Sequence, residues 1–488
     1  MTLLILLPIL APVLASLCAL ALGWRRSSAV LTCASALTIL GCGVALGLRT
    51  GDEAQLALDG VLRADALSAT MLIVIGVVGS LATWASIGYI DTELATGHTD
   101  AGGARLYGTL TPAFLAAMAL AVSANNIGVV WIAVEATTVV TAFLVGHHRT
   151  RAALEATWKY VMVCSVGITI AFLGTVLLHF ASLHAGAGGE DALDLDVLAA
   201  HAGGLDPSVA RLAGVLLLIG YGAKMGLAPF HTWLADAHSQ APAPVSALMS
   251  GVLLSVAFSV LIRIKPIIDV AVGPEFLRTA LLVAGLTTLL IAALLLTVTA
   301  DLKRMLAYSS METMGLIAVA AAAGTRLAVT ALLLHVLAHG VGKTVLFLAG
   351  GQLQVAHRST AIGEITAVLG RSRLVGGAFA VGMLVLLGLP PFAMFASEVA
   401  IAISLADTRL TWALGVALLG LVVAFAALVR NTGRILLGAP AAGSPAIRVP
   451  ATVAAALVTG VALSIALGVT AGPLSDLFAS AASQLGVR

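Results

Sequence analysis

Charged side chains are scarce in this sequence. Asp, Glu, Lys and Arg make up 10% of its 488 residues, whereas 60% of the residues are hydrophobic. About a quarter of the residues of a water-soluble domain are charged. The composition therefore excludes a water-soluble domain and indicates a chain embedded in a lipid bilayer. The net charge of +2 gives no reason to expect a nucleic-acid partner.

Cysteine is rare as well. The four cysteines all lie in apolar stretches, and no two of them form a C-x-x-C pair: Cys18, Cys33, Cys42 and Cys164. Scattered cysteines of this kind are typical of apolar packing. We therefore expect no disulfide, no iron–sulfur cluster, no haem and no other cofactor in this chain. The N-terminus also lacks a basic region, so we expect its first apolar run to be a retained helix and not a signal peptide.

Long apolar runs are what the sequence has in their place. A run of about 20 apolar residues can cross the hydrocarbon core as a helix, and fourteen such runs predict an all-α polytopic membrane protein. They lie near residues 2–23, 28–48, 66–89, 108–124, 126–146, 156–180, 210–228, 243–264, 278–299, 303–323, 327–350, 374–400, 409–430 and 450–472.

Lys and Arg are more frequent in the connections on one side of these runs, and the other side holds the acidic connections. Positive side chains favour the cytoplasmic side of a membrane. We therefore expect a multi-pass protein of the cell inner (plasma) membrane with both termini outside the cytoplasm.

Two of the runs contain the same interruption. The motif Gly-Leu-Ala-Pro-Phe at 226–230 recurs as Gly-Leu-Pro-Pro-Phe at 388–392. Proline inside a helix removes a backbone hydrogen bond and kinks or breaks the helix. Broken helices in two corresponding halves are typical of the ion site of a transporter, although a chance recurrence in a glycine-rich membrane chain is the alternative.

Some charged residues lie within or beside the apolar runs, among them Glu135, Lys224, Lys343 and Glu398. A charge at the bilayer centre costs roughly 2.5–3.5 kcal/mol on insertion scales, so each of these residues needs a reason to be there. Glu135 lies in the middle of a run, Lys224 precedes the first interruption, and Glu398 follows the second. We interpret them as proton-path residues. The alternatives are a packing hydrogen bond for Glu135, a snorkelling lysine for Lys224 and a helix-end surface position for Glu398.

A row of titratable residues recurs at one-turn intervals in a third run. His335, His339 and Lys343 have the spacing i, i+4 and i+8, which places them on one face of a helix. Such a row suits proton transfer through intervening water, or it consists of satisfied polar groups between helices. The two histidines lack the glutamate of a zinc-protease helix and a third ligand nearby, so we expect no metal.

Several residues near the first interruption have a secondary place in this hypothesis. His231, Asp236 and His238 follow the break and either line an access to the buried row or are solvated in a loop. Lys159 is either part of the same path or an interfacial lysine beside two aromatic residues.

Four segments, in order along the chain, resemble the antiporter-like proton-channel subunits of respiratory complex I, multisubunit cation/proton antiporters and membrane-bound hydrogenases. The segments are LAPFHTWLADAHSQAPAPVSALMSGVLL, DLKRMLAYSSMETMG, HVLAHGVGKTVLFLAGG and GLPPFAMFASE. The resemblance runs from about residue 65 to 435, and it is strongest to the hydrogenase-4 and formate hydrogenlyase branch.

The resemblance implies fourteen transmembrane helices with two inverted five-helix repeats, whose seventh and twelfth helices are broken. The corresponding parts are the first three helices at 1–107, the two repeats at 108–264 and 278–435, and the last helix at 450–488. It also implies that Glu135 pairs with Lys224, that His339 and Lys343 form a central relay, and that Glu398 is the terminal charge.

Two positions depart from the pattern of many relatives. Ser255 stands where they carry a lysine, and Thr313 where they carry a histidine. Water held by these hydroxyls would have to bridge the gaps; otherwise the path conducts poorly and the subunit is partly structural.

The resemblance favours a proton-translocating membrane subunit of a respiratory-type oxidoreductase, with the electron-transfer chemistry in partner subunits. The expected partners are other membrane subunits and soluble redox subunits of a hydrogenase-like or complex I-like assembly. Two alternatives stay open: a subunit of a multisubunit Na⁺/H⁺ antiporter, and a non-pumping membrane scaffold.

Overall fold

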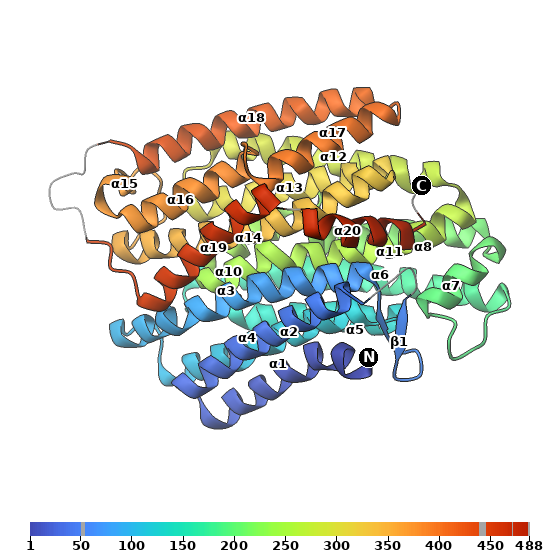
Figure 1. The fold of residues 1–488 in the computed structure, drawn as a ribbon, viewed down its shortest axis with the longest axis horizontal. Coiled ribbons are helices and arrows are strands. Elements are labelled where there is room, and N and C mark those ends of the chain that lie inside the picture. Colours follow the sequence, from blue (N-terminus) through green and yellow to red (C-terminus); the bar gives the residue numbers. More distant parts are fainter. Residues whose placement is uncertain (50–53, 439–445, 471, 487–488) are drawn as a thin grey trace.

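Long helices run side by side across the bundle in Figure 1. The computed structural model describes residues 1–49, 54–438, 446–470 and 472–486. In these residues, 13 helices are long and apolar enough to cross a membrane. The twelfth predicted run is divided between two shorter helices and completes the fourteen. The predicted all-α polytopic membrane fold is confirmed.

The first half of the chain contains the helices and the short hairpin that lead to the first break. They are α1 (Thr2–Leu22), α2 (Arg26–Gly47), β1 (Gln55–Ala57), β2 (Leu62–Ala64), α3 (Ala66–Thr96), α4 (Ala101–Ser123), α5 (Ile127–Val145), α6 (Arg151–His184), α7 (Leu195–His201), the 3₁₀ turn η1 (Ala202–Gly204), α8 (Pro207–Met225) and α9 (Thr232–Gln240). The two strands pair antiparallel, with Leu56 opposite Arg63.

The second half continues the bundle through the second break. Its elements are α10 (Ala243–Leu248), the π turn η2 (Met249–Leu253), α11 (Leu254–Val272), α12 (Pro274–Val298), α13 (Leu302–Ala323), α14 (Arg326–His357), α15 (Val368–Arg371), α16 (Arg373–Leu386), α17 (Ala393–Asp407), α18 (Thr411–Leu436), α19 (Ala451–Thr470) and α20 (Gly472–Gln484). The last predicted run, at 450–472, corresponds to α19, and α20 is a further helix within the segment 450–488. The start of α1 and the end of α20 lie toward the same end of the bundle (Figure 1).

Polar capping residues set the helix ends. Asn126 separates the fourth and fifth runs because its side chain accepts hydrogen bonds from the backbone of Gly128 and Val129, at 2.9 and 3.4 Å. Its amide also donates to Asp194 at 2.7 Å and ties this helix end to the segment before α7. The predicted separation of these two runs is therefore confirmed.

The centre of the bundle consists of α3, α10–α11, α13 and α14, whose residues are almost all buried. The π turn η2, which leads into α11, approaches α14 closely where Gly251 meets Gly340. A Cβ atom on either glycine would lie 2.9–3.0 Å from the carbonyl oxygen of the other. Small residues at such crossings let membrane helices pack backbone to backbone. The outer faces of α6 and α18 expose large apolar side chains, as lipid contact requires.

Both predicted breaks are present. The first separates α8 from α9, and the second separates α16 from α17. Gly226 and Gly388 begin the two interruptions in the left-handed region, with φ of 77° and 58°, a conformation that glycine adopts at little cost. The Ala228–Pro229 and Pro390–Pro391 bonds are both cis. The inverted relation of the segments 108–264 and 278–435 stays a prediction.

A buried ion-pair cluster joins the start of α3 to α11. Asp65 caps α3 by accepting from Ser68 N at 2.7 Å. Its two oxygens also accept from Arg263 at 2.5 and 2.8 Å, and one of them accepts from Arg63 at 2.8 Å. Burial alone would raise the pKa of Asp65, but Arg263 and Arg63 hold that pKa well below its ordinary range.

Asp65→Asn is expected to reduce the free energy of unfolding by roughly 3–5 kcal/mol, because it leaves buried guanidinium groups without their carboxylate. Because the folded-state pKa of Asp65 is lowered, its stabilising contribution is present above the unfolded pKa of about 4 and is lost as the pH falls below that value. Thermal denaturation of the purified protein in detergent measures both effects. Asp59→Asn, at an exposed carboxylate, is the control, and an equal midpoint for the two variants would contradict the assignment.

Candidate functional site

Lys224 is a fully buried lysine in the last turn of α8, just before the first break. Its ammonium donates to Thr138 Oγ1 on α5 at 2.8 Å and to the Tyr160 hydroxyl on α6 at 2.7 Å. The Tyr160 hydroxyl shares a further hydrogen bond of 2.5 Å with Thr141. Since a buried charge needs hydrogen-bond partners to offset its desolvation, three helices converge here on one ammonium group.

Glu135 lies one turn before Thr138 on α5. Ser165 on α6 donates to its Oε1 at 3.1 Å, and its Oε2 is buried with no hydrogen-bond partner in the part of the chain that the structure describes. Glu135 is within electrostatic reach of Lys224. Among the described residues, however, no ion pair within 4.0 Å joins the two. Their predicted pairing stays a prediction.

The short helix α9 connects this lysine to the centre of the bundle. The Trp233 ring lies 4.9 Å from the Tyr160 ring and 6.0 Å from that of His238, which in turn lies 6.0 Å from Phe347 on α14. His238 is fully buried and within electrostatic reach of His339 and Lys343. The structure therefore brings His238 into the interior and not into a solvated loop.

The three residues of the α14 row are all fully buried along one continuous helix. Lys343 donates to the Leu306 carbonyl at 2.7 Å and to the Ser309 hydroxyl, both on α13. His335 shares a hydrogen bond of 2.8 Å with Ser397 on α17.

His339 stands between His335 and Lys343. Neither of its ring nitrogens has a hydrogen-bond partner among the described residues. A buried polar group without a partner costs about 1–3 kcal/mol. A water molecule that binds His339 would offset this cost and provide the medium for proton transfer.

Two carboxylates meet at the second break. Glu398 on α17 packs against Gly388, where a Cβ atom would lie 2.3 Å from a Glu398 carboxylate oxygen. Glu398 and Glu312 line the same cavity of about 200 Å³, between α13, α16, α17 and α18. Glu312 is within electrostatic reach of both Lys343 and Glu398. It therefore stands between the α14 row and the predicted terminal charge.

The remaining predicted residues lie at the margins. The Lys159 side chain is 44% exposed and forms ion pairs with Glu155 at 2.6 Å and Asp236 at 2.9 Å, apart from the buried row. His231 is half-buried at the start of α9. Ser255 is fully buried just after the π turn, and its hydroxyl has no partner within the described residues. A π turn inside a membrane helix often accompanies a functional position.

Sequence reasoning missed several buried residues, two of them on α13. Glu312 is the one acidic residue in the run 303–323, and this isolation was the available signal. Lys303 looked like one of a pair of loop cations with Arg304, yet it is fully buried and donates to the Ala241 carbonyl at 2.6 Å. Adjacent residues of a helix lie about 100° apart, so one of two neighbouring cations can point inward.

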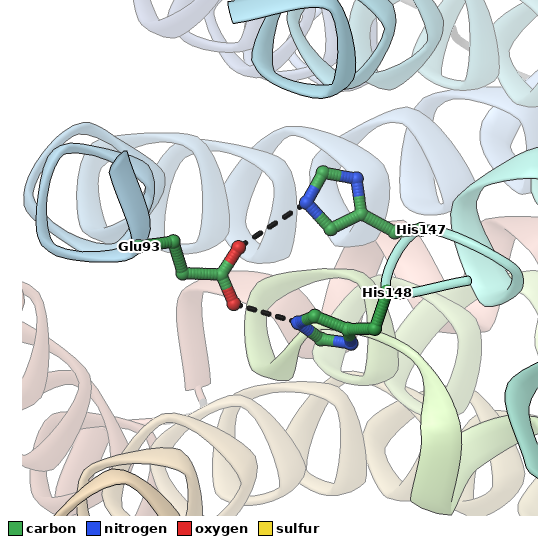
Figure 2. Close-up of side chains that lie close together, drawn as sticks. All are labelled: Glu93, His147 and His148. Carbon is green, nitrogen blue, oxygen red and sulfur yellow. Dashed lines mark hydrogen bonds and ion pairs between the residues drawn. The ribbon is translucent and has the colours of Figure 1, made fainter. Parts of the chain in front are cut away.

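The described residues contain one group of side chains with the convergence that a metal site needs (Figure 2). Glu93 on α3 lies between His147 and His148, whose Nε2 atoms are 3.2 and 2.7 Å from its two oxygens. The three side chains already bind one another, and Arg358 and Arg448 line the cavity beside them. Because these positive charges oppose a bound cation, we assign no metal to this group.

One family model, described as "NADH:quinone oxidoreductase/Mrp antiporter, TM", matches residues 124–424. This segment holds every residue of the buried row from Glu135 to Glu398. The chain belongs to this family. The predicted resemblance is confirmed.

Individual proteins and solved structures that are similar to this chain agree with the family assignment. A hydrogenase-4 component F homolog of Methylacidiphilum infernorum is 35% identical over 386 residues, which cover 79% of this chain and 80% of the relative. A chain of the membrane-bound sulfane sulfur reductase, an archaeal respiratory membrane complex, has a TM-score of 0.88 at 22% identity. The match covers 99% of this chain and 98% of that one. A chain of the Mrp complex from Dietzia sp. DQ12-45-1b has a TM-score of 0.86 at 21% identity, with the same coverage. The two structures show that the fold is shared.

Gly388→Ala is expected to displace the Glu398 carboxylate from the second break of this antiporter-family fold. The new methyl group would occupy the position of that carboxylate, and the left-handed backbone adds about 1–2 kcal/mol of strain for a residue with a side chain. We expect a lower thermal midpoint for the purified protein. Gly377→Ala, on α16 with no atom within 4 Å of the added Cβ, is the matched control, and it should keep or slightly raise the midpoint.

Proposed function

We propose that this chain is the proton-translocating membrane subunit of a respiratory-type oxidoreductase complex of the hydrogenase-4, formate hydrogenlyase or NADH:quinone type. The observation that carries the proposal is a row of buried ionisable side chains that crosses the interior from the first break to the second. The row consists of Lys224, His238, His339, Lys343, Glu312 and Glu398, with Glu135 beside its start and His335 beside its centre.

The row suits protons because its neighbouring members are linked through contacts in the interior. The rings of Tyr160 and Trp233 lie between Lys224 and His238. A change of charge at Lys343 changes the field at His238 and Glu312, so these groups are coupled. Moving one charge against 100 mV costs about 2.3 kcal/mol. In a low-dielectric interior, a partner charge that moves by a few ångströms changes the interaction energy by a comparable amount.

Glu135 is the candidate for that moving partner. It is held by one hydrogen bond from Ser165, and it lies close to Lys224 without an ion pair. We propose that electron transfer in a partner subunit displaces a charge and thereby changes the separation of Glu135 and Lys224. A proton would then pass along the row toward Glu398.

The electron-transfer chemistry belongs in this proposal to soluble redox subunits, with further membrane subunits in contact with this chain. The four cysteines are free, and no two of them form a C-x-x-C pair, which supports placing the redox centres in other subunits. We further propose that the face with Arg358 and Arg448 is cytoplasmic in a plasma membrane and that both termini are outside. The start of α1 and the end of α20 lie toward the same end of the bundle (Figure 1), which supports placing both termini on one side.

Lys224→Met tests the proposal in the assembled complex. Methionine keeps the length of the side chain but cannot hold a proton, so proton translocation should fall by at least ~100-fold while electron transfer continues. Translocation is measured as acidification or alkalinisation of vesicles after a redox substrate is added. Lys265→Met is the control, since that lysine pairs with Asp269 on its own helix and is outside the row. Unchanged translocation in Lys224→Met would overturn the proposal.

The same vesicles separate the two alternatives. A Na⁺-dependent pH change without any redox substrate would point to an Na⁺/H⁺ antiporter subunit. Full proton translocation in both Lys224→Met and Glu135→Gln would indicate that this chain is a non-pumping scaffold.

A further inference from the structure

A polar cavity lies away from both breaks, on the face of the bundle that holds Arg358 and Arg448 and that we call the arginine-rich face. Its volume is about 650 Å³, and its lining includes Glu93, His98, His148, Arg358 and Arg448, together with glutamine and threonine side chains. A cavity of this size and polarity holds many water molecules. It reaches the ends of α3, α5 and α14 and the segment that follows residue 445.

Glu93 and His148 line this cavity. His147 contacts the other oxygen of the Glu93 carboxylate (Figure 2). α5 ends at Val145, and the turn that follows, in which Arg149 has a φ of 53°, directs His147 and His148 toward the same carboxylate. The exposed fractions of the side chains are 23% for His148, 7% for Glu93 and 2% for His147. The group therefore extends from water into the interior.

Lys303 continues this line inward. It is fully buried, and its ammonium donates to the Ala241 carbonyl. Gln240, the residue before Ala241, lines the cavity. On the other side, the Ser246 hydroxyl contacts the same Ala241 carbonyl at 3.2 Å and donates at 2.7 Å to the carbonyl of His238, which belongs to the buried row. No residue of the row itself lines the cavity in the described part of the chain.

We propose that His148, Glu93 and Lys303 form the aqueous access of the buried row on the arginine-rich face. A proton from the cavity water binds at the Glu93–histidine group, passes to Lys303, and reaches the row at His238. No bond other than those to the transferred proton forms or breaks. This inference rests on the proposed function, because an access has a role only if the row carries protons.

The alternative role for Glu93 is purely structural: it would hold the α5–α6 turn against α3. Glu93→Gln separates the two roles. Glutamine keeps the shape and one hydrogen-bond acceptor but cannot take up a proton at neutral pH. In the assembled complex we expect redox-driven proton translocation to fall at least ~10-fold, with an unchanged content of assembled complex. Glu364→Gln, at an exposed glutamate in the connection after α14 on the same face, should translocate like the unmodified protein.

A second measurement does not depend on transport or on electron transfer. With the four native cysteines replaced by alanine, His148→Cys should react with a membrane-impermeant maleimide from the same side of the membrane as Glu364→Cys. It should react more slowly, because the cavity restricts the reagent. Lack of reaction under conditions that label Glu364→Cys, or reaction from the opposite side, would overturn the proposal.

The Lys224→Met variant distinguishes the two ways of failing. Lost translocation in Lys224→Met with normal translocation in Glu93→Gln would refute this access and keep the proposed function. Normal translocation in both variants would refute the proposed function itself, and the access with it.

Discussion

Three ammonium groups, those of Lys224, Lys303 and Lys343, are fully buried, and hydroxyl or carbonyl oxygens hold each of them. None has a carboxylate within ion-pair distance in the described part of the chain. A buried ion pair keeps both partners charged, since removing one charge leaves the other unpaired at a cost of several kcal/mol. Neutral oxygens impose no such penalty. The occupancy of the proton therefore depends on more distant charges, such as Glu135, Glu93 and Glu312.

The two breaks place these groups. A continuous helix would satisfy its own backbone hydrogen bonds and would extend α8 past Lys224. Instead the chain turns at Gly226, and α9 brings Trp233 and His238 across to α14. The second turn, at Gly388, leaves room for the Glu398 carboxylate beside the backbone. The same local motif thus positions a base at one end of the row and an acid at the other.

Most of the fold was predictable because a bilayer imposes a simple rule: an apolar run of sufficient length crosses it as a helix. Proline and glycine marked the breaks for an equally direct reason, the loss of a backbone donor and the tolerance of a left-handed turn. Lys224, His339, Lys343 and Glu398 could be selected because each is a charge or a titratable group stranded in an apolar run.

Other residues carried no such signal. Lys303, Glu93 and the histidine pair lie at the ends of helices, where charged residues are ordinarily solvated, and only the packing of α3, α13 and the α5–α6 turn reveals that they are buried. Glu312 is also an isolated charge in an apolar run, but we considered its neighbour Thr313 instead. Lys159 is a charged residue in an apolar run, as the residues of the row are, yet it lies at the surface. Hydropathy identifies the helices and cannot tell which side of a helix end faces inward.

The contact between Gly251 and Gly340 has a mechanical meaning for the residue beside it. Because the two backbones lie so close at this crossing, α14 cannot slide or rotate against η2 without losing the close packing between them. His339 is therefore anchored at a fixed depth. A signal that reaches this histidine by torsion of its ring, by displaced solvent or by a change in field leaves the crossing intact, whereas sliding of its helix would separate the two glycines.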